Sequence, residues 1–233
     1  MYSYSVKICP GDLDASGKLH TCILFMLSQE AADIDNTSLG IGKRETTDRG
    51  LLWVIIWQKA EIYSLPTYDD IITVETWPGK QRHMLFLRYT RFLDKNGNVL
   101  ADMSATWVLI SKDSRQLISP EDYGISFKET ITGFEISPPK APQKLDTDKF
   151  SYFIAPYSYT DMNGHLSNTR YFDIAEDLIP DIAVSKTPKR ISVEYSSEIL
   201  MGEKIKISYG SKDEKYFFSG DGDVHKFTLL YEY

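Results

Sequence analysis

Four polar side chains lie within eight residues of the stretch YTDMNGHLSNTRY: Asp161, Asn163, His165 and Asn168. A carboxylate, an amide and an imidazole can orient a reactant, hold a carbonyl oxygen and move a proton near neutral pH. The same residue types are also typical of a turn that leads into a helix cap. Taken alone, the stretch is compatible with an active site and with a simple turn.

An internal repeat helps to separate these two interpretations. The segment DASGKLHTCILFMLSQEAADI, starting at Asp14, aligns without gaps with DMNGHLSNTRYFDIAEDLI, starting at Asp161. Each copy continues into apolar residues near helical spacing, less regular in the second copy. Further on, AEIYSLPTYDDIITVETW aligns with VEYSSEILMGEKIKISYG, so that Glu61 matches Glu194 and an alternating strand follows. Each copy then contains a hairpin, which an Asn-Gly turn marks in the first and a Gly/Asp turn in the second.

The repeat predicts an α+β protein built from two similar units. Each unit should contain a short strand, a turn with Asp and Gly, one helix and several antiparallel strands. Between them, SPPKAPQKLDTDK is rich in proline and polar residues, which is typical of a linker. We therefore predict an N-terminal unit at 1–135, a linker at 136–149 and a C-terminal unit at 150–233.

The two copies differ at the positions that chemistry would need. The second copy has Asn163, His165 and Glu198 where the first has Ser16, Lys18 and Leu65. The Asp and the Gly that both copies share are then interpreted as scaffold. The sequence therefore predicts one catalytic half and one half specialised for binding, with a single catalytic site per chain.

Composition limits the class of protein. The chain has 233 residues, and its hydrophobic and charged fractions of 42% and 25% are ordinary for a globular protein. Its net charge of −7 argues against non-specific nucleic-acid binding but leaves room for a local basic patch. No apolar run approaches the ~20 residues of a membrane span, and the start shows no signal-peptide order. Cys9 and Cys22 fit neither a metal-binding spacing nor a disulfide framework. We expect a cytoplasmic protein without a cofactor or metal.

A helix lying along an antiparallel sheet, preceded by D-x-x-G-H, resembles the hot-dog thioesterases. Two such units, with D-x-N-x-H in the second, resemble the acyl-acyl carrier protein thioesterases over nearly the whole chain. LLWVIIWQKAEI and WVLISKDSRQL carry the resemblance in the first half, and EYSSEI places Glu198 on the family's catalytic Glu. The resemblance implies a tandem hot-dog fold, hydrolysis of fatty acyl thioesters to free fatty acid, and acyl carrier protein as partner. Monomer and homodimer both stay open, because the fused units already supply the usual hot-dog pair.

Two departures from the plant members of the family bear on mechanism and source. Those members carry a plastid-targeting extension that is absent here, which fits a bacterial protein. They also have a Cys after the catalytic Glu, where this chain has Ile199. A hydrocarbon offers no nucleophile, so we expect water to attack. Glu198 is the first candidate to activate that water, while His165 orients it or shares its proton. Asn163 holds the carbonyl or the water, and Asp161 orients the pair or acts as the base.

The family analogy also suggests where the substrate lies. The acyl pocket is expected in the N-terminal half, with Trp53, Ile55, Trp57 and Met26 as lining candidates, although an ordinary core role suits them equally. Asn168 continues the motif into the helix and is a further candidate for substrate binding.

An acidic carrier protein needs local positive charge on its enzyme. The runs KQRHMLFLRYTR and KTPKR are the richest in basic residues. Three other functions remain compatible with the sequence. The first is an acyl-CoA thioesterase, which would use the same chemistry on acyl chains carried by coenzyme A. The others are a non-catalytic acyl-binding hot-dog protein and a hot-dog dehydratase, neither of which would hydrolyse thioesters.

Overall fold

The structure, a computed structural model, describes residues 1–126 and 128–233. The strands of the first half are β1 (Tyr2–Lys7), β2 (Leu51–Ile62), β3 (Ile71–Pro78), β4 (Phe86–Leu93) and β5 (Val99–Ser111). Those of the second half are β6 (Lys149–Ile154), β7 (Arg190–Tyr195), β8 (Lys204–Lys212), β9 (Lys215–Asp221) and β10 (His225–Glu232). The α-helices are α1 (Thr21–Ser38), α2 (Lys43–Thr47), α3 (Arg170–Asp177) and α4 (Pro180–Ser185).

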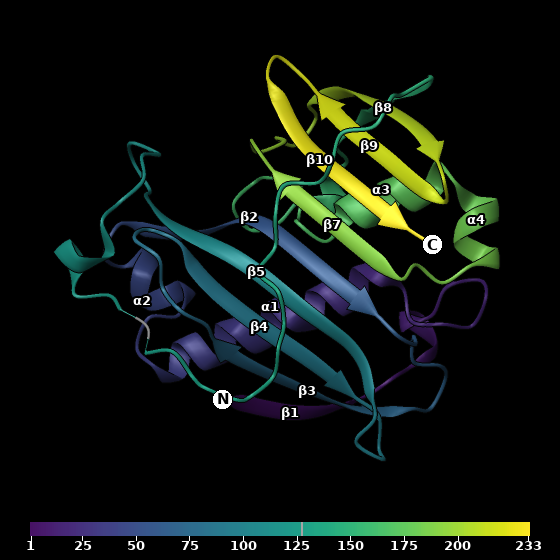
Figure 1. Cartoon of the computed structure of the whole chain (residues 1–233). Helices are drawn as coiled ribbons and strands as arrows, with labels where there is room; N and C mark the ends of the chain where they lie inside the picture. Colours follow the sequence, from purple (N-terminus) through teal and green to yellow (C-terminus); the bar gives the residue numbers. More distant parts are fainter. Residues whose placement is uncertain (127) are drawn as a thin grey trace.

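All ten strands form one antiparallel sheet (Figure 1). Its order is β1-β3-β4-β5-β2-β7-β10-β9-β8-β6. Equivalent strands of the two halves lie at equal distances from the two edges of the sheet. Counted inward, β1, β3, β4, β5 and β2 of the first half correspond to β6, β8, β9, β10 and β7 of the second. The α+β class and the internal repeat are therefore confirmed. The two halves join where β2 pairs with β7, and we call this junction the seam.

The seam has approximate twofold symmetry. In the pairing of β2 with β7, Lys59 lies opposite Ser192, and the sequence repeat aligns these same two residues. Between the helices, Phe25 of α1 stacks on Phe172 of α3 with their ring centroids 3.8 Å apart. These two rings are also equivalent in the repeat, and both are fully buried. The symmetry axis therefore passes through the sheet and then between the two helices.

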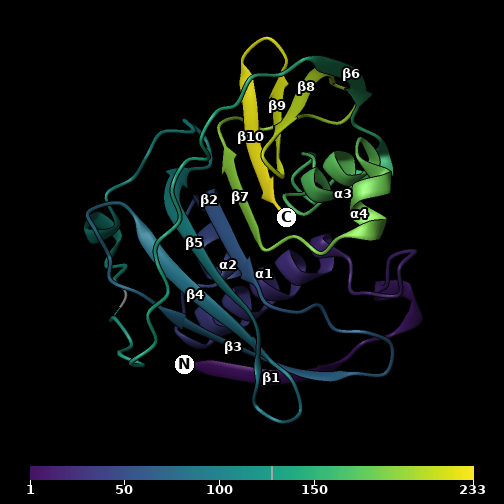
Figure 2. The ribbon, with the colours of Figure 1, turned by 45° about the vertical axis from the view of Figure 1, so that its right-hand side comes forward.

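The helices lie on one face of the curved sheet (Figure 2). The first half has its predicted long helix, α1, whose buried residues include Leu24, Leu27 and Ala31. The second half has two shorter helices instead of one, because Pro180 cannot continue the hydrogen-bond ladder of α3 and begins α4. The first half also contains the short helix α2, which the sequence did not predict. In the described part of the chain, no helix is both long enough and apolar enough to cross a membrane.

The segment that joins the halves crosses the face of the sheet opposite the helices (Figure 1). Ser104 of β5 donates its hydroxyl to the Ser137 carbonyl at 2.9 Å, and the Lys59 ammonium donates to the Ser137 hydroxyl. The second half then opens with β6 at Lys149. Our exact unit boundaries, 135 and 150, stay a prediction.

A buried ion pair fastens α1 to β4. One guanidinium nitrogen of Arg88 lies 2.6 Å from an Asp35 carboxylate oxygen, and another lies 2.5 Å from the Asn36 side-chain oxygen. The exposed fractions of the Arg88 and Asp35 residues are only 4% and 7%. Burial lowers the pKa of the Arg88 guanidinium, and the Asp35 carboxylate opposes that shift. Each charge therefore depends on its partner to remain buried.

Replacing Asp35 by Asn should destabilise the protein by about 3–5 kcal/mol, because the substitution removes the carboxylate that pairs with the buried Arg88 guanidinium. Urea unfolding would measure the change. Asp69→Asn is the matched control, since Asp69 forms an exposed pair with Lys7 at 2.6 Å and should hardly alter the free energy of unfolding. Equal effects of the two substitutions would contradict this interpretation.

Candidate active site

A tight loop organises the polar residues of the second half. An Asp161 carboxylate oxygen accepts the backbone N–H groups of Asn163 at 2.8 Å and His165 at 3.3 Å. The other oxygen accepts the Asn163 side-chain amide at 3.1 Å. Gly164, at φ 81°, supplies the left-handed residue that the loop requires. Asp161 therefore fixes both the loop and the Asn163 side chain.

The first half repeats this loop with other side chains. An Asp14 carboxylate oxygen accepts the backbone N–H groups of Ser16 at 2.8 Å and Lys18 at 3.1 Å, and Gly17 has φ 79°. Asp14 thus holds a loop whose side chains lack both the amide and the imidazole. The comparison supports a scaffold role for the Asp and the Gly.

Backbone pairing brings His165 next to Glu198. The Leu166 N–H donates to the Ile199 carbonyl at 2.8 Å, and His165 forms a β-bridge with Leu200. As a result, Nε2 of His165 lies 3.3 Å from a carboxylate oxygen of Glu198.

The corresponding backbone bond of the first half joins the Leu19 N–H to the Pro66 carbonyl at 2.8 Å. The repeat alignment places Pro66 on Ile199, so Leu65 holds the backbone position of Glu198. Where the second half presents a carboxylate, the first therefore has a buried hydrocarbon.

Two cations hold Glu198 in place. The Arg115 guanidinium pairs with both carboxylate oxygens, and the Lys226 ammonium donates to the Glu198 backbone carbonyl at 2.8 Å. Arg115 lies beyond β5 in the first half and has φ 58°, a conformation uncommon for residues other than glycine. The carboxylate is therefore shared by an imidazole from its own half and a guanidinium from the other half.

These groups border a cavity between the halves. One part of it, about 310 Å³, lies against α1 and α2, and an adjoining part, about 380 Å³, lies against β2 and the end of β7. Both parts are lined by Trp53, Arg115, Asp161, Asn163, His165, Asn168 and Glu198. The second part adds apolar side chains, among them Ile55, Val108 and Leu166. The cavity is thus of ligand size, and its wall combines the polar cluster with apolar side chains.

The structure brings most of the predicted site residues together. Trp53, Ile55 and Asn168 border the cavity with the four polar candidates, but Trp57 and Met26 are not among the described residues that line it.

A β-bulge explains the position of Trp57. Opposite β5, Ile55 pairs with Trp107 and Trp57 with Thr106, so β2 has one extra residue between these pairs. The bulge turns Trp57 to the face opposite Ile55. There, the Trp57 indole N–H donates to Glu194 at 3.1 Å across the seam.

Among the cavity residues that the sequence prediction missed are Arg115 and Gln29. Arg115 belongs to the segment WVLISKDSRQL, which carried the family resemblance, and its charge and position after a predicted strand were available signals. Gln29 of α1 also lines the cavity, and its buried amide nitrogen has no hydrogen-bond partner in the described part of the chain. No sequence pattern distinguishes this glutamine from an ordinary polar helix residue.

Two protein-family models match the chain. The model of the acyl-ACP thioesterase N-terminal domain matches residues 1–123, and that of the C-terminal domain matches residues 143–225. The chain is 28% identical over 173 residues to a palmitoyl-acyl carrier protein thioesterase from Cuphea hookeriana, covering 68% of this chain and 41% of that protein. A palmitoyl-acyl carrier protein thioesterase from Arabidopsis thaliana is 24% identical over 211 residues, with coverages of 84% and 51%. The chain thus spans about half the length of these curated relatives, or less.

Solved structures confirm the double hot-dog fold. The 12:0-ACP thioesterase from Umbellularia californica superposes with a TM-score of 0.86 at 21% identity, covering 99% of this chain and 96% of that one. An acyl-ACP thioesterase from Bacteroides thetaiotaomicron gives 0.83 at 20% identity, with coverages of 99% and 96%. A DHNA-CoA thioesterase from Staphylococcus aureus covers only 52% of this chain, at a TM-score of 0.50 and 14% identity, with 82% of that chain matched. Since the two family models together span most of the sequence, the chain belongs to the acyl-ACP thioesterase family.

Proposed function

We propose that this protein hydrolyses fatty acyl thioesters of acyl carrier protein and releases free fatty acid, with water as nucleophile. The observation that carries the proposal is the Glu198 carboxylate, which contacts both His165 and Arg115 at a cavity whose wall is partly apolar. A binding protein for acyl chains has no need of this polar arrangement. Family membership gives the arrangement its substrate class.

In the proposed reaction, a water oxygen attacks the thioester carbonyl carbon while Glu198 and His165 take up the proton. The carbon–sulfur bond then breaks, and the proton taken from water passes from Glu198 and His165 to the leaving sulfur, which departs as the carrier thiol. Arg115 keeps the carboxylate turned toward the imidazole. The amides of Asn163 and Gln29 are the candidates to donate hydrogen bonds to the carbonyl oxygen as its negative charge develops.

Two alternatives for the mechanism lose support in this geometry. Both Asp161 carboxylate oxygens already accept hydrogen bonds from its own loop, as one Asp14 oxygen does in the first half, which favours a positioning role over that of base. A cysteine nucleophile also has no basis at this cavity. Ile199 is fully buried, and neither cysteine is among the residues that line the cavity.

The basic runs expected to dock the carrier are partly engaged within the fold. In the first run, Arg88 is buried against Asp35, and Arg91 pairs with Asp102 at 2.7 Å. In the second, Arg190 pairs with Glu61 at 2.9 Å across the seam. Docking of an acidic carrier would therefore rely on the exposed members, such as Lys80 and Arg82. The cytoplasmic location also stays a prediction from composition.

Loss of the proposed proton-transfer groups should abolish most of the activity. His165→Ala and Glu198→Gln should each lower kcat on an acyl carrier protein substrate by about 10²–10⁴-fold, because each removes a group that handles the proton. Single-turnover hydrolysis would measure this effect. Lys18→Ala is the matched control, since Lys18 holds the place of His165 in the other half, and it should retain wild-type kcat. Unchanged rates in both site variants would overturn the assignment.

The carrier preference separates this proposal from an acyl-CoA thioesterase. For one and the same acyl chain, we expect a higher kcat/KM on the acyl carrier protein thioester than on the CoA thioester. Reversing the charge of Lys80 and Arg82 should raise KM for the carrier substrate and leave CoA hydrolysis unchanged. A higher kcat/KM on CoA would favour the CoA enzyme instead.

A further inference from the structure

A second cavity lies at the seam, in the place that the repeat assigns to the counterpart of the catalytic one. It measures about 470 Å³ and is bordered by Asp14, Glu176 and Asp177. The repeat alignment places these residues on Asp161, Gln29 and Glu30, all of which border the catalytic cavity. The two cavities therefore occupy equivalent positions about the approximate twofold axis but are lined by different chemical groups.

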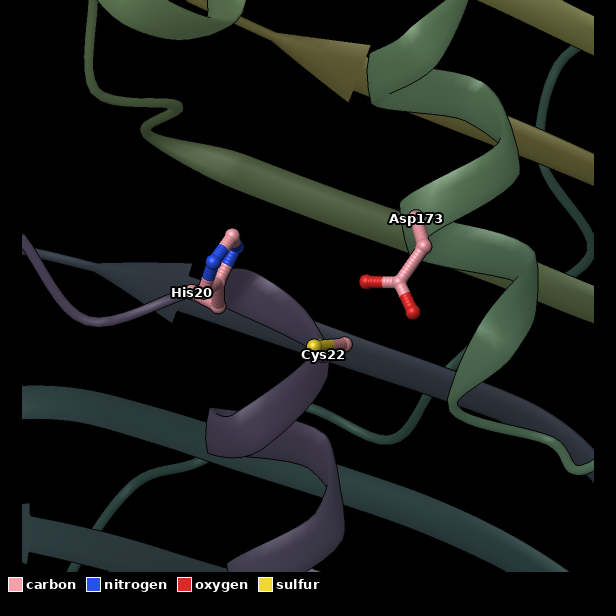
Figure 3. Close-up of side chains that lie close together, drawn as sticks. All are labelled: His20, Cys22 and Asp173. Carbon is pink, nitrogen blue, oxygen red and sulfur yellow. The ribbon is translucent and has the colours of Figure 1, made fainter. Parts of the chain in front are cut away.

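Three potential metal ligands converge at this second cavity. They are His20, which immediately precedes α1, Cys22 in the first turn of α1, and Asp173 in α3. One ligand atom from each lies within 4.8 Å of the other two. In Figure 3 the thiol, the imidazole and the carboxylate border a common space between the two helices. Their chemistry is that of a mixed nitrogen, sulfur and oxygen site.

The surroundings of these ligands favour a cation. Asp14, Glu176 and Asp177 add three carboxyl groups to that of Asp173, whereas Arg170 is the one cationic side chain bordering this cavity in the described part of the chain. Burial raises the pKa of the Glu176 carboxyl to about 7. At neutral pH Glu176 is therefore only partly ionised and adds less than a full negative charge.

Contacts around the three ligands are compatible with a metal shell. Arg170 donates to one Asp173 carboxylate oxygen at 2.8 Å and leaves the other oxygen for a metal, so Arg170 can orient this ligand from outside the shell. The Cys22 thiol is buried, and its present partner is the Asp173 carboxylate. The His20 ring makes no hydrogen bond in the described part of the chain and is therefore available to turn toward the cavity.

We propose that His20, Cys22 and Asp173 bind one zinc ion at the counterpart cavity. Zinc accepts imidazole nitrogen, thiolate sulfur and carboxylate oxygen in a tetrahedral shell, and three protein ligands leave a fourth position for water facing the cavity. Binding releases the Cys22 thiol proton to solvent. Ligand bonds of about 2.0–2.3 Å require the three donor atoms to approach by about 1 Å, which side-chain rotation supplies. Because His20 and Cys22 belong to one half and Asp173 to the other, the ion would link the halves.

Metal binding to the full chain tests this proposal. Purified protein stripped with a chelator is titrated with zinc against a chromophoric competitor, and separately with cobalt(II). We expect one zinc per chain, a thiolate-to-cobalt charge-transfer band, and a zinc-dependent rise in the melting temperature. Cys22→Ser should remove the charge-transfer band and weaken zinc binding by more than about 100-fold.

Variants distinguish this site from other metal binding. Cys9→Ser is the matched control, since the exposed Cys9 is the other cysteine of the chain, and it should bind zinc like wild type. Asp173→Asn tests the ligand from the second half and should weaken binding by at least about 10-fold without loss of fold, as checked by circular dichroism. The absence of stoichiometric zinc binding by wild type, or equal affinity in Cys22→Ser, would overturn the proposal. All readouts concern metal binding, so they are independent of hydrolytic activity.

Discussion

The antiparallel pairing of β2 with β7 determines how the two halves of the protein lie relative to each other. It joins two five-stranded repeats into one sheet and places Lys59 opposite Ser192, its own equivalent. Side chains across this pairing form related contacts: Glu61 binds Arg190, and Glu194 binds Trp57. On the helical face, Phe25 meets Phe172 along the same axis. Because these contacts fix the relation of the halves, each Asp-Gly loop is held against the helix of the opposite half.

This arrangement creates two equivalent cavities that are lined by different side chains. At one of them, Asn163, His165 and Glu198 face a guanidinium from the other half. At its counterpart, the loop has Ser16 and Lys18, with Leu65 buried at the position of the carboxylate. The backbone bonds of the two loops are nearly the same, so the difference in chemistry comes from substitution within a retained scaffold. A duplicated unit can keep one cavity for catalysis and leave the other for a different ligand.

The sequence repeat predicted the architecture because the residues that both copies share are ones that the backbone of the loop requires. Asp14 and Asp161 accept N–H groups of their own loops, and Gly17 and Gly164 adopt positive φ, so the same residues recur wherever the loop is needed. The polar group at the second loop could be located for the same reason, because its differences from the first loop stand out against a fixed scaffold.

Other features depend on tertiary contacts that cannot be predicted from the neighbouring sequence. The bulge in β2 turns Trp57 away from the cavity, although alternation would place it beside Trp53 and Ile55. Arg115 reaches Glu198 only because the seam brings the end of β5 near β7. Likewise, Asp173 is far from Cys22 in sequence, so cysteine spacing gave no sign of a mixed ligand set. Residues that meet across the seam were therefore the ones that the sequence could not assign.

The pairing of β2 with β7 builds two equivalent cavities, and we propose that one of them per chain is catalytic. Calorimetric titration of the full chain with a thioether analogue of an acyl carrier protein substrate, which cannot be hydrolysed, distinguishes one substrate site from two. We expect one analogue bound per chain, with affinity lowered by Arg115→Met at the cavity that His165 and Glu198 line. Two analogues bound per chain with equal affinities would refute a single site.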